Sequence, residues 1–324
     1  MKLLAATRNG IAIAQESSDG WQLEKFVLEG REVTSIIARE GVALAGTRSG
    51  ILRSEDGGET WEPADGGLRI RHVRWLAYHP QFSDYEFAGT EPAAIFHSVD
   101  GARSWQPSPE VEKMRDRFGW QLPYSQEAGC VRGFAFHGAR VYAAVEDGAV
   151  LRSDDIGGSW RLAVGSAGTR LHNPGEGQVH SDVHSIEVHP DAADLVVAPT
   201  GGGLFSSRDG GATWENLYRC YCRAVWLDPG DANHLVFGPA SSVDRDGRLE
   251  ESLDGGSSWK PIQEGSDAPW RRHMVERLIA GGKTLFAILS NGELLASRIN
   301  QWRWRRILSE VGGIGDVALI GNMG

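Results

Sequence analysis

One eight-residue pattern, Ser-x-Asp-x-Gly-x-x-Trp, recurs five times in this 324-residue chain and constrains its fold more than any other feature. The copies read SEDGGETW at 54–61, SVDGARSW at 98–105, SDDIGGSW at 153–160, SRDGGATW at 207–214 and SLDGGSSW at 252–259. An alternating apolar segment, a turn of small residues and a second strand-like segment precede the copies, as in VALAGTRSGILR before the first. The pattern therefore indicates a repeated structural unit.

The repeats predict a seven-bladed β-propeller of four-stranded blades, an all-β fold in a single domain over 1–324. Two degenerate copies end at Trp21 and Trp304, so the blade tryptophans fall at 21, 61, 105, 160, 214, 259 and 304. A period of roughly 40–50 residues with four short strands is typical of propellers. A further strand opens each unit except the first. The segment IGDVALIG at 314–321 is expected to complete the first blade, which would remove exposed sheet edges.

The repeated pattern has a structural explanation in turn chemistry. We expect each of its aspartates to accept hydrogen bonds from turn N–H groups between the third and fourth strands. These structural residues are Asp56, Asp100, Asp155, Asp209 and Asp254. Glycines allow positive φ, and each tryptophan ring is expected to pack between blades. Ala102 replaces a glycine, which predicts a distorted turn in that copy.

The repeated phrase resembles the Asp-box, or BNR repeat, and the resemblance covers nearly the whole chain. That repeat occurs in sialidases, sortilin-type receptors, xyloglucanases and the photosystem II assembly factors related to them. The resemblance implies the propeller scaffold, but these families share a fold and not a reaction. The sialidase Phe-Arg-Ile-Pro signature is absent from this sequence, and sialidases have six blades where this chain is expected to have seven.

The composition of the chain argues against some classes of binding partner and location. The net charge of −10 disfavours general binding to nucleic acid or to anionic membranes. No segment approaches the ~18 apolar residues of a membrane helix, and the start MKLLAATRNG does not resemble a secretory signal. Three cysteines are too few for a secreted disulfide scaffold, so buried thiols and a cytoplasmic location are expected.

Three long connections lie on the side of the blades expected to be opposite the repeated turns. They span 106–129, which includes a short expected helix, 161–179 and 260–271, and long irregular loops are often functional. Beneath them the inner strands are expected to present a polar funnel. Its residues are His72, Arg132, His180, Asp182, Arg272 and His273, with Tyr124 and Glu127 from the first loop. Guanidinium groups favour a carboxylate or phosphate guest, although these arginines could instead pair with acidic residues on neighbouring blades.

The segment HSDVHSIEVHP at 180–190 raises the question of a metal site. In a regular strand, residues two apart are separated by about 6.6 Å, so His180, Asp182 and His184 could not all bind one ion. We expect His184 to be a buried core histidine. His180 and Asp182 with His273 are the candidate metal ligands, and a divalent metal is an optional cofactor.

Two functions of different classes remain open. The first is a binding propeller whose funnel takes an anionic small molecule, a carbohydrate or an acidic protein segment. The second is a glycoside hydrolase or another, metal-dependent hydrolase or lyase that uses the same funnel. Glu127, Asp182 and Tyr124 are its candidate catalytic residues, but no spacing singles out the pair of carboxyl groups that glycoside hydrolysis needs.

Overall fold

A computed structural model describes residues 1–18, 20–125, 128–171 and 173–321. It contains seven four-stranded antiparallel sheets, which confirms the predicted all-β, seven-bladed β-propeller fold. One α-helix occurs among the described residues, within the connection where a helix is expected. No described helix is both long enough and apolar enough to span a bilayer.

The described chain falls into two compact units. The first comprises 1–90, 95–107 and 279–324, and the second comprises 91–94 and 108–278. Three sheets belong wholly to the first unit: β28 (Ile314–Ile320), β1 (Lys2–Thr7), β2 (Gly10–Ser17) and β3 (Gly20–Val27); β4 (Val33–Arg39), β5 (Val42–Thr47), β6 (Gly50–Ser54) and β7 (Glu62–Pro63); and β8 (Val73–Tyr78), β9 (Glu86–Thr90), β10 (Ile95–Ser98) and β11 (Gln106–Pro107). A fourth sheet consists of β24 (Val275–Gly281), β25 (Thr284–Leu289), β26 (Leu294–Arg298) and β27 (Arg305–Ile307), and the unit boundary falls within β24.

The second unit contains the helix and three complete blades. The blades are β12 (Cys130–His137), β13 (Arg140–Glu146), β14 (Val150–Ser153) and β15 (Arg161–Leu162); β16 (Glu187–His189), β17 (Ala192–Thr200), β18 (Gly203–Ser207) and β19 (Glu215–Tyr218); and β20 (Tyr221–Leu227), β21 (Leu235–Ala240), β22 (Glu250–Ser252) and β23 (Lys260–Pro261). Helix α1 (Pro109–Phe118) begins with a proline, whose fixed φ suits the first helical position, and ends at the left-handed Gly119.

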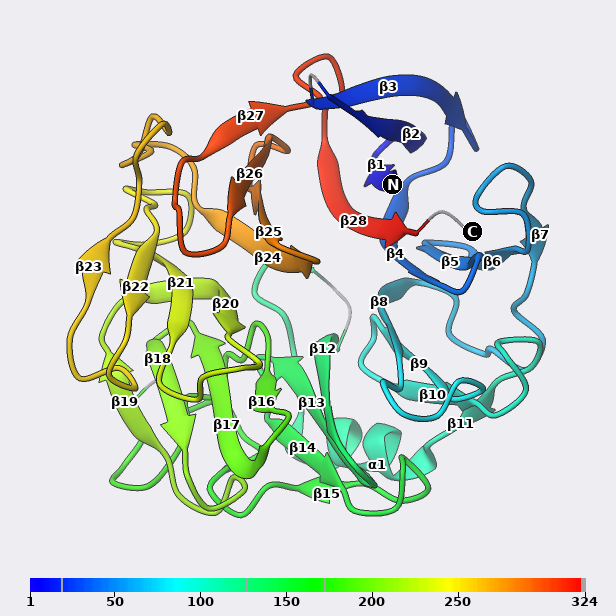
Figure 1. Cartoon of the computed structure of the whole chain (residues 1–324). Helices are drawn as coiled ribbons and strands as arrows, with labels where there is room; N and C mark the ends of the chain where they lie inside the picture. The colour runs from blue at the N-terminus through cyan, green and yellow to red at the C-terminus, as the bar shows by residue number, and fades with distance from the viewer. Residues whose placement is uncertain (19, 126–127, 172, 322–324) are drawn as a thin grey trace. The chain divides into compact units, whose positions relative to one another are not determined.

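The C-terminal strand completes the N-terminal blade, as the strand count predicts. Strand β28 pairs antiparallel with β1, from Lys2 opposite Ile320 to Thr7 opposite Ile314. Figure 1 shows the red β28 beside the blue β1. The first and last strands therefore form one sheet, and the inner edge of β1 is covered by β28.

The repeated turns lie between the third and fourth strands of five blades and share one hydrogen-bond pattern. The serine Oγ donates to the aspartate Oδ1 at 2.7–2.8 Å in every copy. The residue before the tryptophan donates its N–H to the same Oδ1 and its hydroxyl to Oδ2. The expected distortion at Ala102 is wrong, because this residue adopts a φ of 60° and its N–H still reaches Ser98 Oγ at 2.9 Å.

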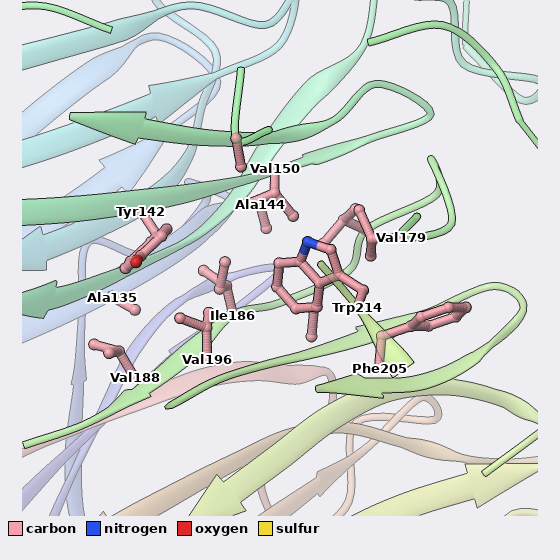
Figure 2. Close-up of a cluster of buried hydrophobic side chains, with 13 residues drawn as sticks. Ala135, Tyr142, Ala144, Val150, Val179, Ile186, Val188, Val196, Phe205 and Trp214 are labelled. Carbon is pink, nitrogen blue, oxygen red and sulfur yellow. The ribbon is translucent and has the colours of Figure 1, made fainter. Parts of the chain in front are cut away.

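The core consists of apolar side chains that pack between successive blades. In the second unit, one cluster joins β12, β13 and β14 to β16, β17 and β18 (Figure 2). Trp214 lies in this cluster beside Val179 and is 5% exposed, which agrees with the expected packing of a tryptophan between blades. The second strands of the blades are buried on both faces, which explains why they read as nearly continuous apolar runs.

The segment SDVHSIEV at 181–188, which the repeat predicts to be the opening strand of its blade, is not a strand for most of its length. Strand β16 begins only at Glu187, and the preceding backbone is irregular apart from an isolated bridge between Val183 and Thr200. The His184 N–H donates to Pro199 O at 2.9 Å, and the Gly201 N–H donates to Asp182 O at 2.9 Å. Residues 181–186 therefore lie in irregular backbone before β16.

Candidate functional site

Seven polar residues of the second unit form what we call the charged cluster, and all of them come from one end of its blades. They are Arg132, Glu146, Asp182, His184, Tyr221, Arg223 and Glu276. Arg132 lies near the start of β12 and Glu146 ends β13. The repeated turn of that blade follows the end of β14, so the cluster lies at the opposite end of the strands from the turn.

The two cluster arginines are paired with carboxylates. Nη1 of Arg132 lies 3.0 Å from Oε2 of Glu146, and its Nη2 lies 3.6 Å from Oε2 of Glu276. Nη1 of Arg223 bonds to Oε1 of Glu276. Arg223 also donates to the hydroxyl oxygen of Tyr221 at 2.9 and 3.1 Å. Both guanidinium groups are thus largely neutralised by acidic neighbours, which is the pairing considered above as an alternative to an anion site.

His184 is the most constrained member of the cluster. Its side chain is fully buried, and Nδ1 lies 2.8 Å from the carbonyl oxygen of Cys222. Its Nε2 lies 3.1 Å from Oδ1 of Asp182 and 3.3 Å from the hydroxyl of Tyr221. The buried, hydrogen-bonded histidine expected from the sequence is therefore present, but it also faces a carboxylate.

Two of the cluster carboxylates, Glu146 and Asp182, are held in their ionised form. Burial alone would raise the pKa of Glu146, but Arg132, His184 and hydrogen bonds from Tyr124 and Cys130 outweigh it and lower the pKa. Burial likewise opposes the ionisation of Asp182, and His184 reverses that effect so that the pKa is lowered. Burial raises the pKa of Tyr221 to about 12, so its phenol keeps its proton near neutrality.

The structure brings together some of the predicted funnel residues. Arg132 and Asp182 belong to the charged cluster, and the hydroxyl of Tyr124 hydrogen-bonds to Glu146 although its ring is largely exposed. His180 is buried, and its Nδ1 accepts the N–H of Asp182 at 3.1 Å. Glu127 lies outside the described residues.

The remaining predicted residues lie elsewhere. Arg272 is exposed and His273 is half-buried, just before β24, where the His273 carbonyl accepts the Gly247 N–H at 3.1 Å. His72 belongs to the first unit. Among described residues, the His, Cys, Asp and Glu ligand atoms that lie within 4.8 Å of one another are those of Glu146, Asp182 and His184. The predicted metal set of His180, Asp182 and His273 shares only Asp182 with this group and stays a prediction.

Sequence reasoning missed Glu146 and Glu276. Glu146 ends the otherwise apolar strand VYAAVE, and it is only 2% exposed. A carboxylate at the buried end of an apolar strand needs a partner, because an isolated buried charge is costly. That signal could have identified Glu146 as a site residue. Its partner Arg132 could be identified only from the pairing of β12 with β13.

No protein-family model matches the sequence. No curated protein matches it either. Solved structures do match, at identities that show the fold alone. An ancestral GH74 enzyme aligns with a TM-score of 0.65 and 17% identity, over 86% of this chain and 39% of that one. The GH74 xyloglucanase from Xanthomonas campestris aligns with a TM-score of 0.61 and 17% identity, over 87% and 46% of the two chains.

A YCF48 protein bound to a D1 peptide is also similar in fold. It aligns with a TM-score of 0.63 and 15% identity, over 92% of this chain and 88% of that one. This chain therefore spans less than half of the two GH74 enzymes but nearly the whole of the YCF48 protein. The expected likeness to xyloglucanases is confirmed at the level of fold.

Proposed function

We propose that this chain is a binding module that recognises an acidic segment of a partner protein at the end of the blades that carries the charged cluster. The observation that carries the proposal is the exposed pair Arg271 and Arg272. Both side chains are exposed, and neither forms an ion pair with any described residue. Guanidinium groups bind carboxylates in a bidentate manner, and an exposed unpaired pair is suited to an acidic peptide.

The backbone around this arginine pair is held in place. Trp270 and Gly247 form an isolated bridge, in which the Trp270 N–H donates to Gly247 O at 2.8 Å. The Gly247 N–H is shared between the carbonyls of Trp270 and His273, at 3.1 Å each. Segments 241–249 and 262–273 are thereby joined where β21 ends and β24 begins. A fixed backbone lowers the entropy that binding must overcome.

The charged cluster does not itself supply the positive charge that an acidic guest needs, because its arginines are already paired with carboxylates. The YCF48 protein of similar length is bound to a peptide, which favours the same class of guest here.

The alternative, glycoside hydrolysis, has weaker support. Asp182 and Glu146 lie close enough to consider as a carboxyl pair. Hydrolysis of a glycoside, however, needs one carboxyl that is protonated near neutral pH. The pKa of each of these two groups is lowered, so neither is suited to donate a proton.

The proposal is tested with a fluorescent deca-glutamate peptide and a deca-lysine peptide as probes. Fluorescence anisotropy at several salt concentrations should show binding of the glutamate peptide only, weakening as salt rises. Reversing both charges, with Arg271→Glu and Arg272→Glu, should weaken binding by about tenfold or more, as expected when two charge-assisted contacts become repulsive.

The matched control is Arg298→Glu, which reverses an exposed arginine at the end of β26. It should change the affinity by less than about twofold, since Arg298 belongs to the first unit and not to the proposed binding segments 241–249 and 262–273. Equal weakening by the control, or equal binding of both peptides, would contradict the proposed site.

A further inference from the structure

Both ring nitrogens of His184 face hydrogen-bond acceptors, and a neutral imidazole cannot donate to both. The carbonyl oxygen of Cys222, 2.8 Å from Nδ1, can only accept, so Nδ1 carries a proton. In a neutral imidazole, Nε2 would then carry a lone pair. That lone pair would face Oδ1 of Asp182 at 3.1 Å, which is also an acceptor. Two acceptors at this distance repel each other unless a positive charge lies between them.

The Tyr221 hydroxyl does not remove this repulsion. It lies 3.3 Å from Nε2 and has one proton to give, while its oxygen accepts from Arg223. A proton donated to Nε2 would leave Oδ1 of Asp182 still facing a nitrogen without a hydrogen of its own. The arrangement therefore needs either a second ring proton or a bound cation.

The neighbouring carboxylates favour a cation that binds several ligands at once. A carboxylate oxygen of Glu146 lies within 4.8 Å of both a ring nitrogen of His184 and a carboxylate oxygen of Asp182. The cluster holds three carboxylates and two guanidinium groups, so it has a net negative charge when His184 is neutral. A ring proton can serve only Asp182, whereas a metal ion is bound by all three groups at once.

From this geometry we propose that His184, Asp182 and Glu146 bind a divalent transition-metal ion, with Zn²⁺ as the probe. Imidazole and carboxylates are ordinary Zn²⁺ ligands, and three protein ligands leave a fourth position for an external ligand. Ligand atoms on one tetrahedral Zn²⁺ lie about 3.4 Å apart, so closing the site requires movement on the order of 1 Å.

Hydrogen bonds from neighbouring groups orient two of the proposed ligands, as such bonds do in protein metal sites. The hydrogen bond from Nδ1 of His184 to the Cys222 carbonyl fixes the tautomer in which Nε2 can bind metal. Arg132 and Cys130 both contact Oε2 of Glu146, at 3.0 and 3.1 Å, and so orient that carboxylate.

His234 provides an internal comparison. Its Nδ1 lies 2.8 Å from Oδ2 of Asp228, and its Nε2 lies 2.9 Å from Oε1 of Glu251. These carboxylates face opposite nitrogens of the ring, so no single ion could be bound by both and by one ring nitrogen. A buried histidine beside carboxylates is thus not by itself a metal site in this chain.

The test uses the full chain stripped with EDTA and titrated with Zn²⁺ by calorimetry. The wild type should bind one equivalent. His184→Gln, Asp182→Asn and Glu146→Gln should each weaken binding by about 100-fold or more, because each removes a direct ligand. The control His234→Gln should stay within about twofold of the wild type. Absence of one-equivalent binding, or equal loss in the control, would overturn the proposal and leave a protonated His184.

A second measurement needs no substitution, in case a variant fails to fold. X-ray absorption of the Zn²⁺-loaded wild type should show nitrogen and oxygen neighbours at about 2.0–2.2 Å. A sulfur neighbour at about 2.3 Å would overturn the ligand set, because it would assign the ion to one of the cysteines. Neither measurement depends on peptide binding, so this proposal and the proposed function can fail separately.

Discussion

Oδ2 of Asp316, in the last strand, accepts a hydrogen bond of 3.1 Å from Oγ of Ser35, 281 residues earlier in the chain. The same oxygen accepts the Ile36 N–H at 2.9 Å. Ser35 Oγ in turn accepts the Leu76 N–H at 3.1 Å, so this pair links β28, β4 and β8 within the first unit. Asp316 and Ser35 are both buried.

Asp316→Ala should therefore destabilise the protein by about 3 kcal/mol, because it leaves a buried N–H and a buried hydroxyl without their acceptor. Thermal unfolding followed by circular dichroism measures the effect. Asp316→Asn keeps a carbonyl oxygen at this place and should cost less. Equal melting temperatures for the alanine variant and the wild type would contradict this role of the C-terminal strand.

Asp209→Ala tests the repeated turn. Asp209 accepts the N–H groups of Ala212 and Thr213 and the hydroxyl of Thr213, which lower its pKa to about 2, with the Thr213 hydroxyl contributing most. Since the turn is exposed, water replaces part of this bonding, and we expect a loss of about 1 kcal/mol. The melting temperature of the alanine variant should lie a few degrees below that of the wild type. The melting temperature of Asp209→Asn should fall less. An unchanged melting temperature in the alanine variant would show that the carboxylate does not stabilise the turn.

Ile156 occupies a turn position that other copies give to glycine. Its φ is 57°, and its N–H donates to Ala139 O at 2.9 Å, as Gly210 does to Asp194 O at 3.0 Å. A left-handed conformation costs an L-residue roughly 1–2 kcal/mol, while glycine costs about 0.5–1 kcal/mol in chain entropy. Ile156→Gly should therefore raise the free energy of unfolding by up to about 1 kcal/mol. Ile156→Ala keeps the strain and serves as the control; greater stability of the alanine variant would refute this explanation.

The local and the distant parts of the structure differ in how well sequence predicts them. The repeated turns depend on residues within eight positions, so Ser207, Asp209 and Thr213 could be interpreted from spacing alone. The pairing of β28 with β1 followed from counting strands. Both features depend on pattern and not on the exact positions of side chains.

The charged cluster could not be predicted in this way. A regular strand over 181–188 would place the backbones of Asp182 and His184 about 6.6 Å apart, and that spacing does not say whether their side chains meet. In the structure the backbone before β16 is irregular, and Oδ1 of Asp182 lies 3.1 Å from Nε2 of His184. Glu146 and Glu276 come from other blades, and no local pattern connects them to this segment.

Glu86 should give the stability of the protein a pH dependence. Its side chain is buried in the first unit, and burial raises its pKa to about 7. The folded state therefore binds a proton between about pH 7 and the unfolded value of 4.5, and the free energy of unfolding falls as pH rises through this window. One such proton gives a slope of up to about 1.4 kcal/mol per pH unit.

Glu86→Gln should remove that slope while keeping an acceptor for the Ala102 N–H, which lies 2.9 Å from Oε2. Melting temperatures compared between pH 5 and pH 7.5 measure the effect. Glu187→Gln should reduce the slope in the same way, because burial also raises the pKa of Glu187 to about 7. An unchanged or steeper pH dependence in either variant would contradict the role given to that carboxyl group.

The central claim is the location of the binding surface. Its most direct test is hydrogen–deuterium exchange, measured by mass spectrometry with and without the deca-glutamate peptide. If an acidic segment binds at Arg271 and Arg272, backbone amides in 241–249 and 262–273 should exchange more slowly when the peptide is present. The repeated turns at 207–214 and 252–259 lie at the other end of the strands and should not change. Protection of those turns, without protection of 262–273, would contradict the account.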